Sequence, residues 1–504
     1  MPVNIDIRSL TYTYDGSAEP VFENLTARLD TAWRLGLTGR NGRGKTTLLR
    51  LLCGELEGGR SIHMPLKAVY FPYPVPDPSL CTMEVMRLSA PGTEEWRFLC
   101  EWNQLFGSEE ALERPFHTLS NGEQTKALLC ALFAREDVYP LIDEPTNHLD
   151  LHGRALVADY LSRKDGFLLV SHDRAFLNRC IDHVTAMERT KITVMQGNYD
   201  SWEAAFDLKN ESEAARNETL RREIARLGQS ARRAASFSQN AEKGRFHVPE
   251  SEVAALDRGY VGARSAALMK RAKGIQRRRE KEMEEKSKLL KNVEQVGELK
   301  LSTLHHPKQR LISVENGVVS YDGRIVCGNI RFQVERGQRI ALSGANGCGK
   351  SSILKALCGR GGSLCGDVSV AAGLTVSYVP QSTEGLSGPV REYIAAHALD
   401  ETLFKAILRN MGLSREQFDR PLQHFSQGQK KKVLLAASLC TPAHLYVWDE
   451  PLNYIDVLSR RQVEELIVEY APTLLIVEHD RTFLENIGAE VVELNQTAPQ
   501  EEER

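Results

Sequence analysis

The spacing of apolar residues along the chain predicts an α/β protein. Residues 34–38 and 339–343 read as buried strands, and each leads into a glycine-rich segment. Residues 139–142 and 445–448 are apolar runs that end on a carboxylate, while residues 46–53 predict a helix after the first glycine-rich segment. Continuous apolar runs of this length are typical of parallel strands that are covered on both faces. The pattern therefore favours parallel sheets flanked by helices.

Between these two blocks the pattern changes to long polar helices. One helix is predicted from Trp202 to Ala235 and another from about 261 to 296, with an irregular tip at about 237–260. The tip contains Gly244, Pro249 and Gly259, which break helices. A helix of about 35 residues spans roughly 50 Å at about 1.5 Å per residue. We expect a long antiparallel helical hairpin at residues 201–310.

Composition excludes several classes of protein. The chain has 504 residues and a formal net charge of −3, and it holds no apolar run of the roughly 18 residues that a membrane span needs. Its first residues lack the basic and apolar regions of a signal peptide. The ten cysteines form no CxxC pair, so we expect free thiols in a reducing compartment. These features predict a cytoplasmic protein.

The small net charge hides an uneven distribution. Residues 229–279 carry 12 Lys and Arg against 4 Asp and Glu, a net charge of +8, which leaves −11 for the rest of the chain. A basic segment on an acidic body favours a polyanionic partner such as nucleic acid. A solvated coiled coil whose basic face binds nothing specific is the alternative explanation for such a charge run.

Four motifs occur twice, in the same order. A glycine-rich GxxxxGK[ST] segment at 39–46 recurs at 344–351, and a Ser-x-Gly segment at 120–122 recurs at 426–428. Asp-Glu-Pro at 143–145 recurs at 449–451, and each copy is followed by a His-Asp pair, at 172 and at 479. The offsets are 305 to 307 residues, so the two halves are collinear. We therefore expect two homologous domains, at residues 1–200 and 311–504.

The GxxxxGK[ST] segments predict two phosphate-binding loops. Their glycines let backbone N–H groups curl around phosphates at a helix N-terminus, while the lysine reaches the β- and γ-phosphates and the hydroxyl binds Mg²⁺. A chance glycine-rich turn is the alternative, but it does not explain two copies that each follow an apolar strand. The predicted nucleotide-binding residues are Gly39, Asn41, Gly42, Gly44, Lys45, Thr46 and Thr47 in the first copy and Gly344, Asn346, Gly347, Gly349, Lys350, Ser351 and Ser352 in the second.

Carboxylates and histidines complete the chemistry. Asp143 and Asp449 end apolar strands, the place for a carboxylate that orients Mg²⁺. The neighbouring Glu144 and Glu450 are candidate general bases for an attacking water. The predicted roles of His172 and His479 are to sense the γ-phosphate. A structural salt bridge for the carboxylates and a structural role for the histidines are the alternatives.

This order of motifs resembles the ATP-binding-cassette ATPases. The sequence Asp-Glu-Pro-Thr-Asn-His-Leu-Asp at 143–150 is similar to the form found in the ABC-F family, twin-cassette proteins that act on ribosomes and lack membrane domains. The resemblance implies a head-to-tail pair of cassettes within a monomer, with ATP and Mg²⁺ as cofactors. Each ATP would lie between the phosphate loop of one cassette and the signature of the other. The signature residues so implied are Ser120, Gly122, Glu123, Ser426, Gly428 and Gln429.

The two halves also differ. Gln381 matches the loop glutamine that helps to hold the metal in such ATPases, but Tyr73 occupies the corresponding place in the first half. The middle signature residues are Asn121 and Gln427 rather than glycine. We therefore predict two unequal ATP sites. Tyr14 and Tyr321 occupy matching places and are candidates to stack on adenine, with plain core aromatics as the alternative.

Several phrases resemble the Lsa-type antibiotic-resistance subgroup of ABC-F proteins. These are residues 40–52, 262–271 and 449–456. The resemblance implies protection of the bacterial 70S ribosome against lincosamides, pleuromutilins and group A streptogramins, through 23S rRNA and the P-site tRNA. The alternatives are a housekeeping or stress translation factor, the ATPase subunit of a drug exporter, and a DNA-directed ATPase. The predicted RNA-binding residues are Arg232, Arg233, Phe237, Lys243, Arg245, Phe246, Lys270, Arg271 and Arg277.

Overall fold

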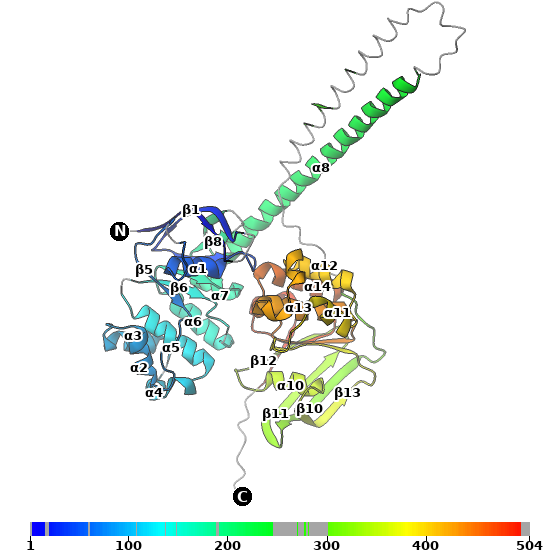
Figure 1. The fold of residues 1–504 in the computed structure, drawn as a ribbon. Coiled ribbons are helices and arrows are strands. Elements are labelled where there is room, and N and C mark those ends of the chain that lie inside the picture. The colour runs from blue at the N-terminus through cyan, green and yellow to red at the C-terminus, as the bar shows by residue number, and fades with distance from the viewer. Residues whose placement is uncertain are drawn as a thin grey trace, which may run out of the picture. The chain divides into compact units, whose positions relative to one another are not determined.

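The chain consists of two compact units in its computed structural model. The structure describes residues 3–15, 20–58, 61–106, 108–136, 138–147, 149–187, 191–244, 270, 277–278, 281 and 301–494. One unit comprises Met1–Trp202 together with Gly297–Arg504, and the other comprises Glu203–Val296. The first unit holds two α/β bodies, which we call cassette 1 and cassette 2 (Figure 1).

Cassette 1 is organised around a six-stranded sheet with the order β5-β6-β7-β3-β8-β9. All neighbouring strands are parallel except β8 and β9. The central strand β7 is buried at every residue, as the continuous apolar pattern predicts. The strands are β3 (Arg34–Thr38), β5 (Lys67–Phe71), β6 (Val138–Asp143), β7 (Phe167–Val170), β8 (His183–Met187) and β9 (Ile192–Gln196).

A smaller antiparallel sheet and a group of helices complete cassette 1. The sheet has the order β2-β1-β4 and shares a core with helix α1. In Figure 1, α2, α3 and α4 gather at the opposite end of the cassette from β1. These elements are β1 (Asn4–Tyr12), β2 (Phe22–Asp30), α1 (Lys45–Cys53), β4 (Ile62–His63), α2 (Thr82–Ser89), α3 (Glu95–Leu105), α4 (Glu110–Glu113), η2 (Phe116–Thr118), α5 (Asn121–Phe133), α6 (Leu151–Ser162) and α7 (Arg174–Cys180).

Cassette 2 repeats this plan. Its parallel sheet has the order β14-β15-β16-β12-β17, and its antiparallel sheet has the order β11-β10-β13. The strands are β10 (Arg310–Tyr321), β11 (Arg324–Glu335), β12 (Arg339–Ser343), β13 (Ser363–Val370), β14 (Val376–Val379), β15 (Leu445–Asp449), β16 (Leu474–Val477) and β17 (Glu490–Glu493). The helices are α10 (Lys350–Leu357), α11 (Val390–Ala396), α12 (Glu401–Asn410), η4 (Arg415–Asp419), η5 (Leu422–His424), α13 (Gln427–Cys440), α14 (Val457–Tyr470) and α15 (Arg481–Asn486). The predicted α/β fold with two cassettes is confirmed.

The second unit contains most of helix α8 (Tyr199–Gly244), which has 46 residues. It continues beyond Ala235, so the prediction that an irregular tip begins at residue 237 is wrong. Residues 236–243 contain neither proline nor glycine, and the helix ends at Gly244. Most of the second predicted helix, at 261–296, lies outside the described residues. Its four described positions, Lys270, Arg277, Arg278 and Lys281, are all helical.

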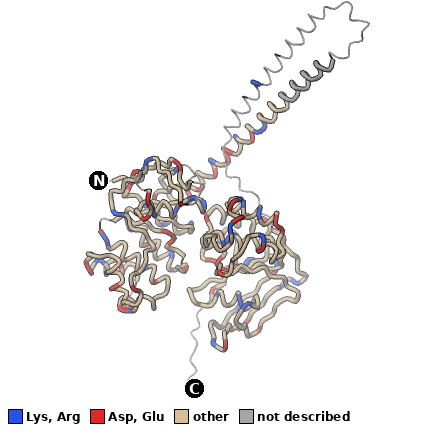
Figure 2. Tube along the Cα trace, in the orientation of Figure 1, with Lys and Arg blue, Asp and Glu red and all other residues tan. Residues whose placement is uncertain are grey.

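Figure 2 shows basic and acidic residues interspersed along the traces of both cassettes. In the part of the chain that the structure describes, no helix is both long and apolar enough to cross a membrane. All ten cysteines are free.

Candidate ATP sites

Both phosphate loops connect a central strand to a helix, and glycine is required where the helix starts. Gly44 precedes α1 with a φ of 90°, and Gly349 precedes α10 with a φ of 96°. A Cβ atom on Gly44 would lie 2.6 Å from Cγ1 of Val21, and one on Gly349 would lie 2.7 Å from Sγ of Cys327. Both the backbone conformation and the packing therefore exclude larger residues. The free N–H groups of each helix start face the loop, as a phosphate site needs.

The loop lysines fold back across their own loops. Lys45 Nζ donates to the Gly39 carbonyl at 2.6 Å and to Asn41 Oδ1 at 3.3 Å. Lys350 Nζ donates to the carbonyls of Gly344, at 2.7 Å, and Ala345, at 2.9 Å. Both lysines are buried, and burial lowers the pKa of Lys45. Each ammonium group is thus held at the cradle where phosphate oxygens would replace the carbonyls.

A hydroxyl and an aspartate meet beside each loop. Thr46 Oγ1 donates to Asp143 Oδ2 at 2.8 Å, and Ser351 Oγ donates to Asp449 Oδ1 at 2.9 Å. Burial raises the pKa of Asp143 and raises that of Asp449 to about 6. Asp449 Oδ2 is buried and has no hydrogen-bond partner among the described residues. Two such buried carboxylates favour a cationic neighbour.

This donor set fits Mg²⁺ bound together with a nucleotide. Mg²⁺ is usually held by one or two carboxylates or hydroxyls, with phosphate oxygens and waters filling its other positions. The described residues include no group of three or more His, Cys, Asp or Glu that could hold a metal ion by themselves. Thr46 with Asp143, and Ser351 with Asp449, would supply the protein's part of each shell.

The two candidate general bases share an unusual backbone conformation. Glu144 has a φ of 52° and Glu450 a φ of 46°, a region that non-glycine residues rarely adopt. The N–H of Glu144 donates to the Val170 carbonyl at 2.8 Å, and the N–H of Glu450 donates to that of Val477 at 2.9 Å. These bonds fix each glutamate at the end of the neighbouring strand.

Each of these glutamates lies next to the histidine of its own cassette that is predicted to sense the γ-phosphate. His172 Nε2 is 3.5 Å from Glu144 Oε1, and His479 Nε2 is 3.8 Å from Glu450 Oε1. Burial lowers the pKa of His172 well below its ordinary value. The structure therefore brings the candidate general base and the candidate γ-phosphate sensor together in each cassette.

The two glutamates differ in their electrostatic environment. Burial and the nearby Asp143 raise the pKa of Glu144 to about 8. Burial also acts on Glu450, but hydrogen bonds from His479 and Gln381 outweigh it and lower the pKa to about 2. Asn453 Nδ2 donates a further hydrogen bond of 2.6 Å to Glu450 Oε2. In contrast, Glu144 Oε1 has no hydrogen-bond partner in the described part of the chain.

The signature serines cap helices. Ser120 Oγ accepts from the N–H of Glu123, whose carboxylate accepts from the N–H of Ser120 at 2.8 Å, at the start of α5. Ser426 and Gln429 form the same reciprocal pair at the start of α13. This arrangement is a capping box. It holds each serine at the positive end of a helix dipole, where an anion is favoured.

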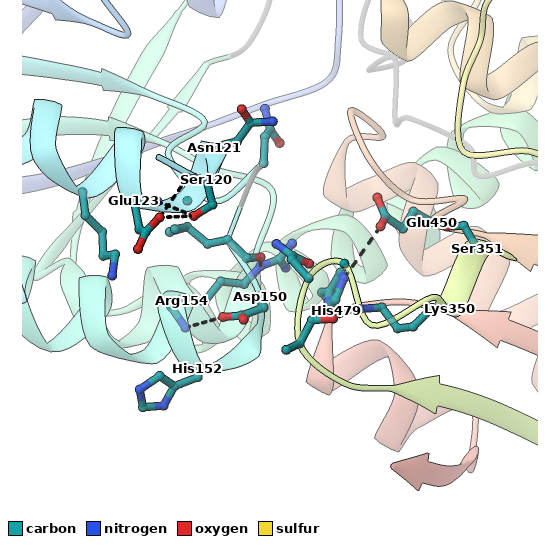
Figure 3. Close-up of a pocket in the computed structure, with 18 of the residues that line it drawn as sticks. Ser120, Asn121, Glu123, Asp150, His152, Arg154, Lys350, Ser351, Glu450 and His479 are labelled. Carbon is teal, nitrogen blue, oxygen red and sulfur yellow. Dashed lines mark hydrogen bonds and ion pairs between the residues drawn. The ribbon is translucent and has the colours of Figure 1, made fainter. Parts of the chain in front are cut away.

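Site 2 is our name for the site formed by the phosphate loop of cassette 2 and the signature of cassette 1. A cavity of about 820 Å³ lies between them. In Figure 3, Ser120, Asn121 and Glu123 lie on one side, and Lys350, Ser351, Glu450 and His479 lie on the other. The predicted residues Gly122, Asn346, Gly347, Gly349, Ser352 and Gln381 also line this cavity. A cavity of this size matches a nucleotide-sized ligand.

Site 1 is our name for the site formed by the phosphate loop of cassette 1 and the signature of cassette 2. Here Asn41 Nδ2 donates to the Tyr454 carbonyl at 2.7 Å. A Cβ atom on the signature residue Gly428 would lie 2.4 Å from the Tyr454 carbonyl oxygen and 3.1 Å from Asn41 Nδ2. The signature glycine and the phosphate loop are thus in direct contact.

The remaining aromatic candidates differ in placement. The Tyr14 hydroxyl is hydrogen-bonded to Thr47 Oγ1 at 2.9 Å, which places this tyrosine beside the first phosphate loop. Tyr321 packs against the core of cassette 2. The Tyr73 hydroxyl donates to the Leu128 carbonyl on α5 at 2.7 Å, so it is directed into the helical core rather than toward a metal.

The predicted RNA-binding residues can be described only in part. Arg232, Arg233, Phe237 and Lys243 lie within α8, and Lys270 and Arg277 are exposed helical residues. Arg245, Phe246 and Arg271 lie outside the described residues.

Several buried charged residues beside the sites were not singled out from the sequence. Lys432 Nζ is 2.6 Å from Asp456 Oδ2, and this charge outweighs burial and lowers the pKa of Asp456. Arg460 pairs with Asp480 at 2.8 Å. Lys431 is 1% exposed, and burial lowers its pKa to about 8. A position-by-position comparison of the two halves would have revealed Lys431, because Thr125 is its counterpart.

Comparisons with known proteins agree with this architecture. A family model described as ABC transporter matches residues 22–71 and 327–453. The ribosome protection protein VmlR of Bacillus subtilis is 28% identical, over 94% of this chain and 84% of its own length. The ATP-binding protein Uup of Caulobacter vibrioides is also 28% identical, over 95% of this chain and 75% of its own length.

A solved structure shares the fold. The archaeal ribosome recycling factor aABCE1, in complex with the stalk protein aP1, superposes with a TM-score of 0.60 at 19% identity, covering 96% of this chain and 87% of its own. At that identity the likeness concerns the fold alone. The paired motifs, the two composite sites and the relatives lead to one assignment: the chain is a twin-cassette ATPase of the ABC-F family.

Proposed function

We propose that this ATPase binds the bacterial 70S ribosome and protects its large subunit from lincosamide, pleuromutilin and streptogramin A antibiotics. The observation that carries this proposal is the match to a ribosome protection protein over 94% of the chain. That match includes the segment between the cassettes. The protein would act as a cytoplasmic monomer, with its two cassettes pairing within one chain.

ATP binding would close the two cassettes on each other. In each site, the phosphate-loop lysine would leave the loop carbonyls for the β- and γ-phosphates, and the signature serine would meet the γ-phosphate from the other cassette. Bound Mg²⁺ would neutralise charge that develops on the phosphates. Glu144 or Glu450 would then accept a proton from the attacking water, while His172 or His479 holds the carboxylate in place. Hydrolysis would reopen the pair.

The interdomain segment, residues 201–310, would be the part that acts on the ribosome. Helix α8, with 46 residues, is about 69 Å long at about 1.5 Å per residue. That length is enough to reach from the ribosomal E site toward the peptidyl-transferase centre. The basic residues at 229–279 would bind phosphates of 23S rRNA and the P-site tRNA, and the segment beyond Gly244 would displace bound drug.

A housekeeping translation factor is the second candidate. The observation that favours it is the equal identity, 28%, to the ATP-binding protein Uup, whose name carries no drug role. Deleting and restoring the gene separates the two functions. A protection factor changes the minimum inhibitory drug concentration, whereas a housekeeping factor changes growth without drug. An exporter subunit is less favoured, and it would lower drug accumulation in whole cells, which target protection does not.

The direct experiment is cell-free translation without membranes. Purified protein should restore synthesis inhibited by a pleuromutilin or a lincosamide, and should not restore synthesis inhibited by a drug that binds the small subunit. The Glu144→Gln, Glu450→Gln double variant should accumulate on ribosomes when ATP is present. Failure of rescue with retained ribosome binding would reject protection and leave the housekeeping role. Failure of the double variant to bind ribosomes would reject both.

A further inference from the structure

One buried lysine connects the signature helix of cassette 2 to that cassette's own catalytic segment. Lys431 lies on α13, three residues after the signature glycine Gly428. Its Nζ donates to the carbonyls of Pro380 at 2.9 Å, Glu450 at 3.0 Å and Asp449 at 3.4 Å. A lysine ammonium has three donors, so all of them are directed at the backbone around site 2.

A second contact joins the same two regions. The Thr383 hydroxyl donates to the side-chain oxygen of Gln427, the middle signature residue. Pro380 and Thr383 flank Gln381, which lines site 2 and hydrogen-bonds to Glu450. The loop that carries Gln381 is therefore tied to α13 on both sides. Gln427 and Lys431 share one helix, so a shift of α13 would move both ties together.

Cassette 1 contains neither tie. Thr125, at the position of Lys431, donates its hydroxyl to the Asn121 carbonyl on its own helix at 2.9 Å. Val75 occupies the position of Thr383 and has no side-chain hydrogen-bonding group. The matched pair of contacts thus belongs to cassette 2, although both cassettes carry the same motifs.

A buried glutamate accompanies the lysine. Glu478 is 3% exposed and precedes His479, where cassette 1 has Ser171. Its carboxylate accepts from the N–H of His479 at 2.7 Å and from that of Leu452 at 3.3 Å. Burying a cation is costly unless an anion lies nearby. Asp449, Glu450 and Glu478 provide that negative charge around Lys431.

We propose that Lys431 and Gln427 are positioning residues for hydrolysis at site 2, acting within their own cassette. They hold the Gln381 loop and the backbone of Glu450 against α13, whose N-terminus also forms the signature wall of site 1. The arrangement makes catalysis at site 2 depend on the helix that contacts the nucleotide of site 1. The reverse connection, from α5 to the Glu144 segment, lacks these ties.

Site-resolved ATP hydrolysis tests this proposal. A Glu144→Gln background leaves hydrolysis to site 2, and a Glu450→Gln background leaves it to site 1; first-turnover rates are measured by rapid quenching. The test variants carry the residues of cassette 1: Lys431→Thr with Glu478→Ser, Gln427→Asn, and Thr383→Val. Lys405→Thr, on the exposed Lys405–Glu401 pair of α12, is the control. Melting temperature and the KM for ATP are recorded for each variant.

The Lys431→Thr, Glu478→Ser variant should slow hydrolysis at site 2 about tenfold, the kinetic equivalent of one charge-assisted hydrogen bond. Gln427→Asn and Thr383→Val should each slow site 2 about threefold, and combining them should add little, because they break one contact. For the Lys431→Thr, Glu478→Ser variant and for Thr383→Val, hydrolysis at site 1 and the KM should change less than about twofold.

Two results would overturn the proposal. One is equal slowing of both sites, which indicates general disruption. The other is slowing of site 1 alone by Gln427→Asn, which indicates that the signature acts only on the nucleotide across the interface. If the Lys431→Thr, Glu478→Ser variant does not fold, Thr383→Val provides the test. An unchanged hydrolysis rate at site 2 in that variant would reject the proposed link between α13 and the Gln381 loop.

Discussion

Site 1 and site 2 are built from the same motifs but differ in their surroundings. In both, a hydroxyl donates to the strand-end aspartate, and a histidine lies beside the glutamate. At site 2 three polar side chains contact Glu450, whose pKa falls to about 2. At site 1 the pKa of Glu144 rises to about 8, and Tyr73 replaces the loop glutamine. A repeated motif therefore determines geometry, while its neighbours determine the charge of the base.

The largest expected effect concerns the two glutamates themselves. Glu450→Gln should lower steady-state ATP turnover about a thousandfold, because it removes the base that Gln381, Asn453 and His479 hold in place. Glu144→Gln should lower it no more than about threefold, because Tyr73 replaces the loop glutamine at site 1. Turnover is measured by phosphate release at saturating ATP. Equal losses in the two variants would show that the sites are equivalent.

Among the described residues, a buried ion pair joins the cassettes at Arg174, and the matching positions of the two halves lack such a pair. Arg174 on α7 pairs with Glu464 on α14, and both side chains are buried. The counterpart Arg481 pairs with Glu485 on its own exposed helix face, and Ala158 stands at the position that matches Glu464. Arg174→Ala should lower the free energy of unfolding by about 3 kcal/mol, since it leaves a buried charge unpaired.

Arg481→Ala is the matched control and should cost less than about 0.5 kcal/mol. Urea unfolding of both variants measures the difference. If the urea midpoints of Arg174→Ala and Arg481→Ala shifted by comparable amounts, the Arg174–Glu464 pair would not join the cassettes.

The next largest effect is expected in the pH dependence of hydrolysis, which should differ between the two sites. The ionised glutamate is the active form of the base, so activity is lost as pH falls below the pKa. For site 1, measured in Glu450→Gln, kcat/KM should rise about tenfold per pH unit up to the pKa of Glu144, about 8, and then level off. For site 2, measured in Glu144→Gln, kcat/KM should stay level above about pH 7, because the pKa of Glu450 is about 2 and that of Asp449, which would hold Mg²⁺, is about 6. Parallel pH profiles of kcat/KM at the two sites would contradict the predicted difference between Glu144 and Glu450.

The smallest effect is expected at the residue that most visibly distinguishes the halves. Tyr73→Phe removes the hydrogen bond to the Leu128 carbonyl and should cost about 1 kcal/mol of stability, without changing the first-turnover rate at site 1. Thermal unfolding and rapid quenching measure the two quantities. A changed rate would place Tyr73 in the chemistry of site 1.

Much of the fold and of the sites follows from the sequence. The two phosphate loops, the strand-end carboxylates and the histidines are local motifs, so spacing and apolar runs predict their places. The sequence comparison of Tyr73 with Gln381 also predicts that the sites differ.

The charge states could not be predicted in this way. The pKa of Glu144 depends on burial and on charges such as Arg460, which the fold brings from the other cassette. Lys431 reads as one lysine in a run of three, and only the packing of α13 shows that it is buried. The end of α8 at Gly244 was also missed, because residues 236–243 carry no strong signal for or against a helix.

The most direct test identifies the nucleotide at each site of the unmodified protein after one turnover. Azido-ATP labelled in its α-phosphate is bound, allowed to react once and cross-linked by light, and the labelled peptides are assigned to each cassette. Site 2, on the loop of Lys350, should hold ADP while site 1, on the loop of Lys45, still holds ATP. Equal amounts of ADP at the two sites, or ADP first at site 1, would contradict the account.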